Sequence, residues 1–257
     1  PIKNDPALLP FGLRDASEQN ADTFLAQIER AGVEFFDLRP RLRQYLKNNY
    51  AAGFYRSDLH WTSDICLWAG RAVAEQLRVR FGFLLDETQF LRESYTAAPL
   101  AKPMLGPLGK TTGQSYSGTD VLQVLTPRFA TDFDVYLRNG RHLEGTMAQA
   151  LLNRAGMEAL RRSDLENVYN NYVYTVDHLT NRRAPNQKRL LFVSESFGIG
   201  VFPYMALAAR EVRYIDWLRS LNTSLPGAAR ALRADAALFL LEPYAVSTGV
   251  TFHFAQE

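Results

Sequence analysis

Residues 190–200 read LLFVSESFGIG, and this segment decides the fold. Its four leading apolar residues are typical of a buried strand, and its two glycines lead into a stretch with helical character. A sharp turn from strand to helix exposes the residue at the turn, which here is Ser196. The same turn aims the backbone N–H groups of the helix start at an incoming oxyanion. The segment therefore predicts an α/β fold with a nucleophilic serine at a strand end.

The rest of the C-terminal third repeats this alternation of strands and helices. Apolar strands are expected at 190–193, 212–216 and 237–241, separated by helices at 203–210 and 226–234. Such strands with helices between them indicate three layers, a mainly parallel central sheet with helices on both faces. Parallel sheets bind ligands at the carboxyl ends of their strands. The residues at or just past those ends are Ser196, Asp216 and Glu242.

Apolar periodicity predicts the other elements. They are helices at 20–31, 42–46, 63–80 and 151–165 and strands at 33–38 and 173–176. Residues 86–134 are rich in Gly, Pro, Thr and Ser, and we expect a loop-rich insertion that lines or covers a cleft. Within it, 106–113 reads GPLGKTTG, but it lacks the spacing of a phosphate loop and no apolar strand leads into it.

A second segment, Asp58-Leu59-His60-Trp61, supplies the groups that a nucleophilic serine needs. An imidazole can take the serine proton, and a nearby carboxylate can fix the tautomer of that imidazole and stabilise its cation. Each piece also has a structural interpretation, a helix cap for Ser196 and a hydrogen-bonded surface histidine for His60. Of the four histidines, however, only His60 has a carboxylate two residues before it, and a helix start follows it directly.

Composition limits the classes of function. The 257 residues, of which 47% are hydrophobic and 22% charged, are enough for one globular domain spanning 1–257. A net charge of +2 gives no field that would attract nucleic acid, so no nucleic-acid partner is expected. Cys66 is the only cysteine, which excludes an intrachain disulfide and a thiolate metal cluster. We expect no metal site.

The sequence contains no run of about 18 apolar residues, the length that a membrane span needs. It opens at Pro1 without an initiator methionine, and no signal peptide is visible. We therefore expect that an upstream segment has been removed.

Two segments resemble the alginate O-acetyltransferase family, of the AlgX/AlgJ type, which is SGNH hydrolase-like. Residues 58–62, DLHWT, resemble its (T/S)-D-x-H-W-(T/S) signature. Residues 194–198, SESFG, and the later Pro203-Tyr204 resemble its G-D-S-F segment and the Pro-Tyr that follows. The order agrees as well, because in this family the Asp/His segment precedes the serine, the reverse of ordinary SGNH hydrolases. The resemblance implies Ser196 as nucleophile, His60 as base and Asp58 as its orienting carboxylate.

The sequence departs from the family at the residues before the serine. The family's Gly-Asp is Ser194-Glu195 here, which keeps an acid but changes its reach and removes a glycine that would ease the turn. The candidate oxyanion or substrate-binding residues, chosen by their position after strands, are Arg219, Asn222 and Tyr244. The candidate aromatic residues for stacking on sugar rings are Trp61, Tyr116, Phe197 and Tyr204. All of these also fit ordinary packing or helix-start positions.

The resemblance implies transfer of an acetyl group to a hydroxyl of an exopolysaccharide such as alginate or cellulose. It implies an acetyl donor as a substrate, no cofactor, a polysaccharide acceptor, and a membrane-bound acyltransferase partner that supplies acetyl groups. It also implies a periplasmic or otherwise exported protein, with an N-terminal segment absent from this chain as its anchor. Two other classes stay open. One is a carbohydrate acetylesterase of the same fold, and the other is a non-catalytic polysaccharide-binding protein of an assembly machinery, which the altered Ser194-Glu195 favours.

Overall fold

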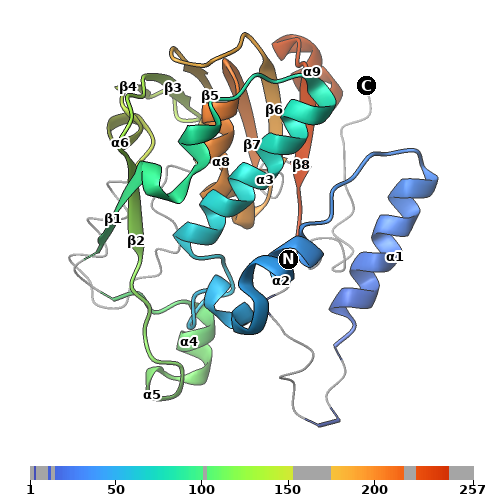
Figure 1. Cartoon of the computed structure of the whole chain (residues 1–257), viewed down its shortest axis with the longest axis vertical. Helices are drawn as coiled ribbons and strands as arrows, with labels where there is room; N and C mark the ends of the chain where they lie inside the picture. The colour runs from blue at the N-terminus through green and yellow to red at the C-terminus, as the bar shows by residue number, and fades with distance from the viewer. Residues whose placement is uncertain are drawn as a thin grey trace.

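The computed structural model describes most of the chain. The described residues are 3, 11–12, 15–100, 103–152, 175–216 and 224–242. A six-stranded sheet forms the centre, and helices lie on both of its faces (Figure 1). None of the described helices combines the length and the apolar character that crossing a bilayer requires.

The central sheet is mixed. Its strands, in spatial order, are β4 (His142–Gly145), β3 (Phe133–Leu137), β5 (Val176–Asn181), β7 (Glu211–Asp216), β6 (Arg189–Ser194) and β8 (Ala236–Leu240). Only the pairs β6–β7 and β6–β8 are parallel, and the other three pairs are antiparallel. The expected α/β fold is confirmed, but the sheet is not mainly parallel.

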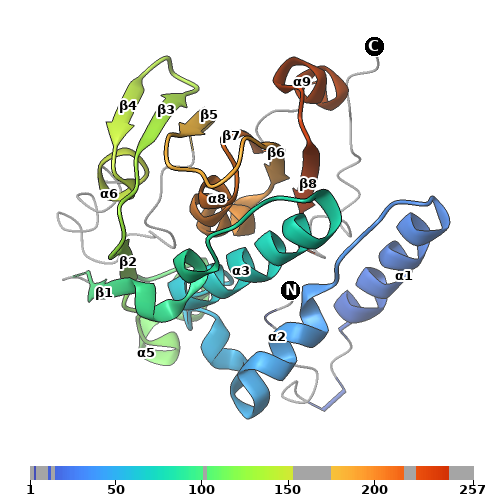
Figure 2. The ribbon, with the colours of Figure 1, turned by 45° about the horizontal axis from the view of Figure 1, so that its top comes forward.

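The sequence analysis missed the antiparallel half of the sheet because its strands contain no long run of consecutive apolar residues. β3 and β5 alternate between buried and more exposed positions, whereas five consecutive residues of β6, Leu190–Ser194, are buried. Strands that are buried on both faces have continuous apolar sequences, whereas strands with one solvent-exposed face alternate between apolar and polar residues. β3 and β4 form a hairpin that stands apart from the parallel strands (Figure 2).

The two faces of β6 belong to two different cores. Leu190 and Phe192 join the large cluster that contains α3 (Ser63–Phe81) and α8 (Ser196–Ala208). Leu191 and Val193 point to the opposite face and pack with residues of α9 (Leu225–Leu232). Successive side chains of a strand alternate between faces, so one apolar run can serve both layers. The three-layer arrangement is therefore confirmed.

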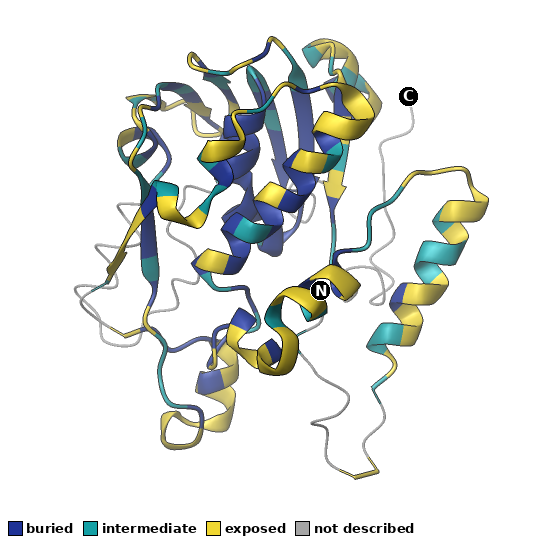
Figure 3. Ribbon diagram, viewed as in Figure 1, coloured by how far each residue is buried: buried dark blue, intermediate teal, exposed yellow. Residues whose placement is uncertain are grey.

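Helix α8 is the central element of the larger core. Twelve of its thirteen residues, Phe197–Ala208, are buried, and it packs on β5, β6 and β7 on one side and on α3 on the other. Figure 3 shows α3 with one exposed and one buried face, as an amphipathic helix at the surface requires. The expected helix at 203–210 thus begins earlier, at Ser196, because Glu195 caps it there.

The N-terminal helices are α1 (Ser17–Arg30) and α2 (Leu38–Leu46), followed by the 3-10 helix η2 (Lys47–Gly53). The predicted helices at 20–31, 42–46 and 63–80 are confirmed, but the predicted strand at 33–38 is wrong. Residues 33–37 have no regular structure, and Asp37 caps α2 by accepting a hydrogen bond from the backbone of Arg39. The buried guanidinium of Arg39 also pairs with Glu18 and Asp22 of α1.

The insertion at 86–134 contains more regular structure than expected. Strands β1 (Tyr95–Pro99) and β2 (Gln123–Pro127) pair antiparallel as a separate two-stranded sheet. The short helices of the insertion are η3 (Glu87–Phe90), η4 (Arg92–Ser94), α4 (Pro107–Thr112) and α5 (Gln114–Ser117). The remaining short helix, α6, spans Met147–Ala150. The predicted helix at 151–165 and strand at 173–176 fall mainly outside the described residues, and β5 begins at Val176.

Candidate active site

Ser196 lies at the turn where β6 leads into α8, as the sequence predicts. It is the first residue of α8, and Glu195 before it caps the helix by accepting a hydrogen bond of 2.8 Å from the backbone N–H of Phe197. Gly198 lets this first turn pack on the end of β6, because a Cβ atom there would stand 2.0 Å from Ser194 Oγ. The turn therefore depends on the small residue after Phe197.

The Asp58 segment forms a closed loop just before α3. Phe54 and Trp61 pair in an isolated antiparallel bridge, and the backbone N–H of Tyr55 donates to the carbonyl of His60 at 3.0 Å. Trp61 is buried and packs edge-on against Phe197, with ring centroids 5.3 Å apart. This aromatic contact ties the loop to the first turn of α8, although the two segments are far apart in the sequence.

Asp58, His60 and Ser196 converge in the geometry of a catalytic triad. His60 Nε2 lies 2.9 Å from Ser196 Oγ, and His60 Nδ1 lies 2.5 Å from Asp58 Oδ1. Asp58 Oδ1 also accepts the backbone N–H of His60 at 2.8 Å. A carboxylate on Nδ1 places the ring proton there and leaves Nε2 as the acceptor for the serine proton.

The surroundings of Asp58 favour its ionised form. Its carboxyl is fully buried, which by itself raises the pKa. The hydrogen bonds and charge of His60, together with the charge of Lys3, outweigh this effect and hold the pKa of Asp58 below its ordinary value. Lys3 donates from Nζ to the carbonyls of Tyr55 and Asp58 at 2.6 and 2.5 Å, so it also fixes the backbone of the loop.

The insertion braces the same loop from the other side. Asp120 accepts hydrogen bonds from the backbone N–H groups of Arg56 and Ser57 at 2.6 and 2.7 Å, and from Ser57 Oγ at 2.5 Å. Ser57 Oγ accepts the backbone N–H of Gly106 at 2.9 Å. A Cβ atom on Gly106 would stand 2.5 Å from the Cβ of Asp58, so only glycine permits this approach. The GPLG stretch therefore packs on the loop that carries Asp58 and His60, called the catalytic loop below because of the role proposed for it.

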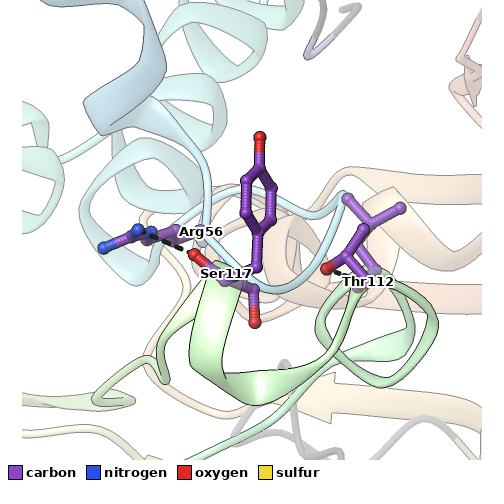
Figure 4. Close-up of a pocket in the computed structure, with 5 residues that line it drawn as sticks. Arg56, Thr112 and Ser117 are labelled. Atoms are coloured by element: carbon purple, nitrogen blue, oxygen red, sulfur yellow. Dashed lines mark hydrogen bonds between the residues drawn. The ribbon is translucent and has the colours of Figure 1, made fainter.

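Next to this brace lies an open cleft of about 480 Å³ (Figure 4). Its lining residues are Arg56, Leu108, Thr112, Tyr116 and Ser117. The Arg56 guanidinium donates to the carbonyl of Tyr116 at 3.1 Å, and the Tyr116 side chain is 78% exposed. The cleft thus combines the cation of Arg56, two residues before Asp58, with the exposed ring of Tyr116.

Several predicted binding residues have other roles. Trp61, Phe197 and Tyr204 are buried in the core between α3 and α8, so they offer no ring face for a sugar. Their apolar surface is needed to pack the turn that carries Ser196, and only Tyr116 of the four predicted aromatic residues is exposed. The predicted donors Arg219, Asn222 and Tyr244 lie outside the described residues.

The sequence interpretation missed Lys3, Arg56 and Asp120. Asp120 and Ser57 are separated by 63 positions, and no local pattern announces such a contact. The glycines of 106–113 were the available signal, since glycine often marks a close approach of backbones. Far from this site, Asp134, His142 and Glu144 cluster on the β3–β4 hairpin. Arg182 pairs with both carboxylates, which makes this cluster an ion-pair network.

We expect Asp120→Asn to reduce activity because the amide cannot accept all three hydrogen bonds from the loop. Loss of bonds to a carboxylate costs about 1–3 kcal/mol, and a small displacement of His60 lowers the rate by roughly 10-fold to 100-fold. Urea unfolding and ester hydrolysis measure the two effects. Glu93→Gln, on the exposed helix η4 of the same insertion, is the matched control. Equal behaviour of the two variants would contradict the bracing role.

Comparison with known protein families matches the N-terminal part of the chain. Residues 11–132 match the family model described as "SGNH hydrolase-like domain, acetyltransferase AlgX". This range contains the Asp58–His60 loop and nearly all of the insertion that braces it. The search of curated proteins gave no match to the chain.

The fold is similar to those of solved structures. Bacillus cereus PatB1 with a sulfonyl adduct gives a TM-score of 0.74 at 16% identity, covering 96% of this chain and 80% of that one. A second structure of Bacillus cereus PatB1 gives 0.70 at the same identity and coverage. A DHHW family protein from Eubacterium siraeum gives 0.59 at 12% identity, covering 82% of this chain and 64% of that one. These likenesses show the fold. The resemblance seen in the sequence is thereby confirmed: residues 11–132 match the model of the SGNH hydrolase-like AlgX acetyltransferases, and the fold is similar to that of PatB1.

Proposed function

We propose that this protein transfers an acetyl group to a hydroxyl of a polysaccharide through an acetyl-serine at Ser196. The observation that carries the proposal is the alignment of Asp58, His60 and Ser196, with contacts of 2.5 and 2.9 Å on the two ring nitrogens of His60. This arrangement activates a serine for attack on an acyl carbon. The acetyltransferase description of the matching family model supports acetyl as the group that moves.

The first half-reaction loads the serine. Ser196 Oγ attacks the carbonyl carbon of the acetyl donor while its proton passes to His60 Nε2, and Asp58 stabilises the resulting imidazolium. The tetrahedral intermediate then expels the leaving group of the donor, which takes the proton from Nε2. The products are an acetyl-serine and the deacetylated donor, so this half-reaction needs an acetyl donor as substrate and no cofactor.

The second half-reaction reverses these steps with a new nucleophile. An acceptor hydroxyl gives its proton to His60 Nε2 and attacks the acetyl-serine, and Ser196 recovers the proton as the acetylated acceptor leaves. Water in place of the acceptor gives acetate, which is the acetylesterase alternative. The balance between the two depends on how well the site positions the acceptor and excludes solvent.

The cleft beside the catalytic loop is the proposed acceptor site. Tyr116 offers an exposed ring of the kind that stacks on a sugar, and Arg56 offers N–H donors for hydroxyl or acidic groups. A polymer needs an open groove rather than a closed pocket, and this cleft is open to solvent. We also propose export to the compartment where the polysaccharide is made, with a membrane-bound acyltransferase as the source of acetyl groups.

The test of the proposed function is hydrolysis of a chromogenic acetyl ester. We expect Ser196→Ala and His60→Ala each to lower kcat/KM by about 10³-fold or more, and Asp58→Asn by roughly 10²-fold to 10⁴-fold through the wrong tautomer. The double variant of Ser196 and His60 should be no worse than either single variant, because the triad acts as a unit.

The matched control is His178→Ala, which removes an exposed histidine that is also beside an aspartate. This variant should keep wild-type activity. Additive losses in the double variant, or full activity of Ser196→Ala, would exclude a serine nucleophile at this site.

Acceptor binding has its own prediction. Tyr116→Ala should reduce acetyl transfer to an oligosaccharide by about tenfold, since stacking of this kind contributes on the order of 1–3 kcal/mol. Hydrolysis of the small ester should change less than twofold, because Tyr116 does not touch the triad. Tyr136→Ala, an exposed tyrosine on β3, is the control. Product analysis by mass spectrometry measures both rates, and equal loss of both activities would contradict the assignment.

A further inference from the structure

Ser196 Oγ has a second neighbour that the triad does not use. Glu195 Oε2 lies 3.2 Å from this oxygen and accepts the backbone N–H of Phe197 at 2.8 Å. The Glu195 side chain is only 1% exposed, and its Oε1 is buried with no hydrogen-bond partner among the described residues. A buried ionised carboxylate with one oxygen unpaired is costly, so this position favours the neutral acid.

The proton count at Ser196 leads to the same conclusion. The serine hydroxyl has one proton, and it faces two acceptors, His60 Nε2 and an ionised Glu195. If the proton points to His60, the serine oxygen faces a carboxylate with no proton between them, which is repulsive. A proton on Glu195 Oε2 removes the conflict, because the acid then donates to Ser196 Oγ while the serine donates to His60.

The charges around Glu195 also favour a bound proton. Burial raises the pKa of Glu195 to about 8, and the charge of Glu242 acts in the same direction, while the hydrogen bond from Phe197 opposes it. Glu242 follows β8, and burial raises its own pKa as well. The other described titratable groups around this strand end are Tyr214 and Asp216 on β7 and Asp58 and His60 on the catalytic loop.

We propose that Glu195 is a catalytic residue that works as a neutral acid, donating a hydrogen bond to Ser196 Oγ and directing the serine proton to His60. This inference rests on the proposed function of Ser196 as the nucleophile. Glu195 keeps its proton throughout the cycle, so the atom balance of both half-reactions is unchanged. Its hydrogen bond stabilises the negative charge that develops on Oγ as the serine attacks, and again when Oγ leaves the acetyl group.

The proposed role explains why this sequence has glutamate where the G-D-S-F pattern has aspartate. Glutamate is one methylene longer than the aspartate of the G-D-S-F pattern, and the longer side chain reaches both the serine oxygen and the backbone N–H of Phe197 from the cap position. An ionised Glu195 would compete with His60 for the serine proton and repel the developing alkoxide. Activity should therefore require the protonated form and fall as pH rises through the pKa of Glu195.

The test compares pH profiles of ester hydrolysis for the wild type and Glu195→Gln. In the wild type, kcat/KM should fall about tenfold per pH unit above pH about 8, because the neutral acid is lost there. Glu195→Gln cannot ionise, so its profile should stay flat in this range. We expect it to lose up to about tenfold at pH 7, because Glu195 uses the single atom Oε2 to accept from Phe197 and to donate to Ser196, and neither the amide oxygen nor the amide nitrogen of glutamine can do both.

Lys3→Arg is the necessary control, since burial also lowers the pKa of Lys3 and its titration would give an alkaline decline too. An arginine keeps its charge, so the decline should persist in this variant if Glu195 causes it. A decline that persists in Glu195→Gln, or disappears in Lys3→Arg, would overturn the proposal. Circular dichroism checks the fold of each variant.

A second measurement needs no variant and separates the two proposals. A sulfonyl fluoride should modify Ser196 with loss of fluoride, and its rate in the wild type should show the same decline above pH about 8. Modification of Ser196 with no such decline would overturn the role of Glu195 and leave the nucleophile in place. No modification of Ser196 at any pH would overturn the nucleophile and the role of Glu195 together.

Discussion

The geometry of the site depends on the hydrogen bonds between the buried carboxylate of Asp58 and His60. One oxygen of Asp58 accepts hydrogen bonds from both the backbone N–H and the Nδ1 of His60, so it fixes the position and the tautomer of the ring at once. Burial of an ionised carboxylate is unfavourable by itself. His60 and Lys3 offset that cost, and the pKa of Asp58 therefore stays below its ordinary value.

The rest of the structure holds the loop that carries Asp58 next to the end of β6, where Ser196 lies. β6 and α8 fix Ser196 from the sheet, and the edge-on contact of Trp61 with Phe197 couples that turn to the histidine loop. Asp120 and Gly106 hold the loop from the insertion. The insertion thus has two roles, a brace for the triad and, in the proposed function, one wall of the acceptor cleft.

The features that could be predicted from the sequence are mainly those that depend on neighbouring residues. The strand at 190–193, the turn after it and the Asp58–His60 pair each depend on neighbouring residues and could be predicted from them. The contact of His60 with Ser196 joins positions 136 apart, and it was predicted from the chemistry that a nucleophilic serine needs and from the family resemblance. Contacts between distant positions, such as Asp120 with Ser57, leave no local pattern and were missed. The strand expected at 33–38 failed because Asp37 caps a helix, and the aromatic residues near Ser196 were misassigned because packing of the turn buries them.

The proposed function requires that acetyl transfer proceed through a covalent intermediate on Ser196. The most direct measurement is peptide mass spectrometry after acid quench of the wild-type protein with a chromogenic acetyl ester. We expect one acetyl group on the peptide that contains Ser196, its absence in His60→Ala, and its loss on addition of an oligosaccharide that becomes O-acetylated. Turnover of the ester with no acetyl group on Ser196 would contradict it.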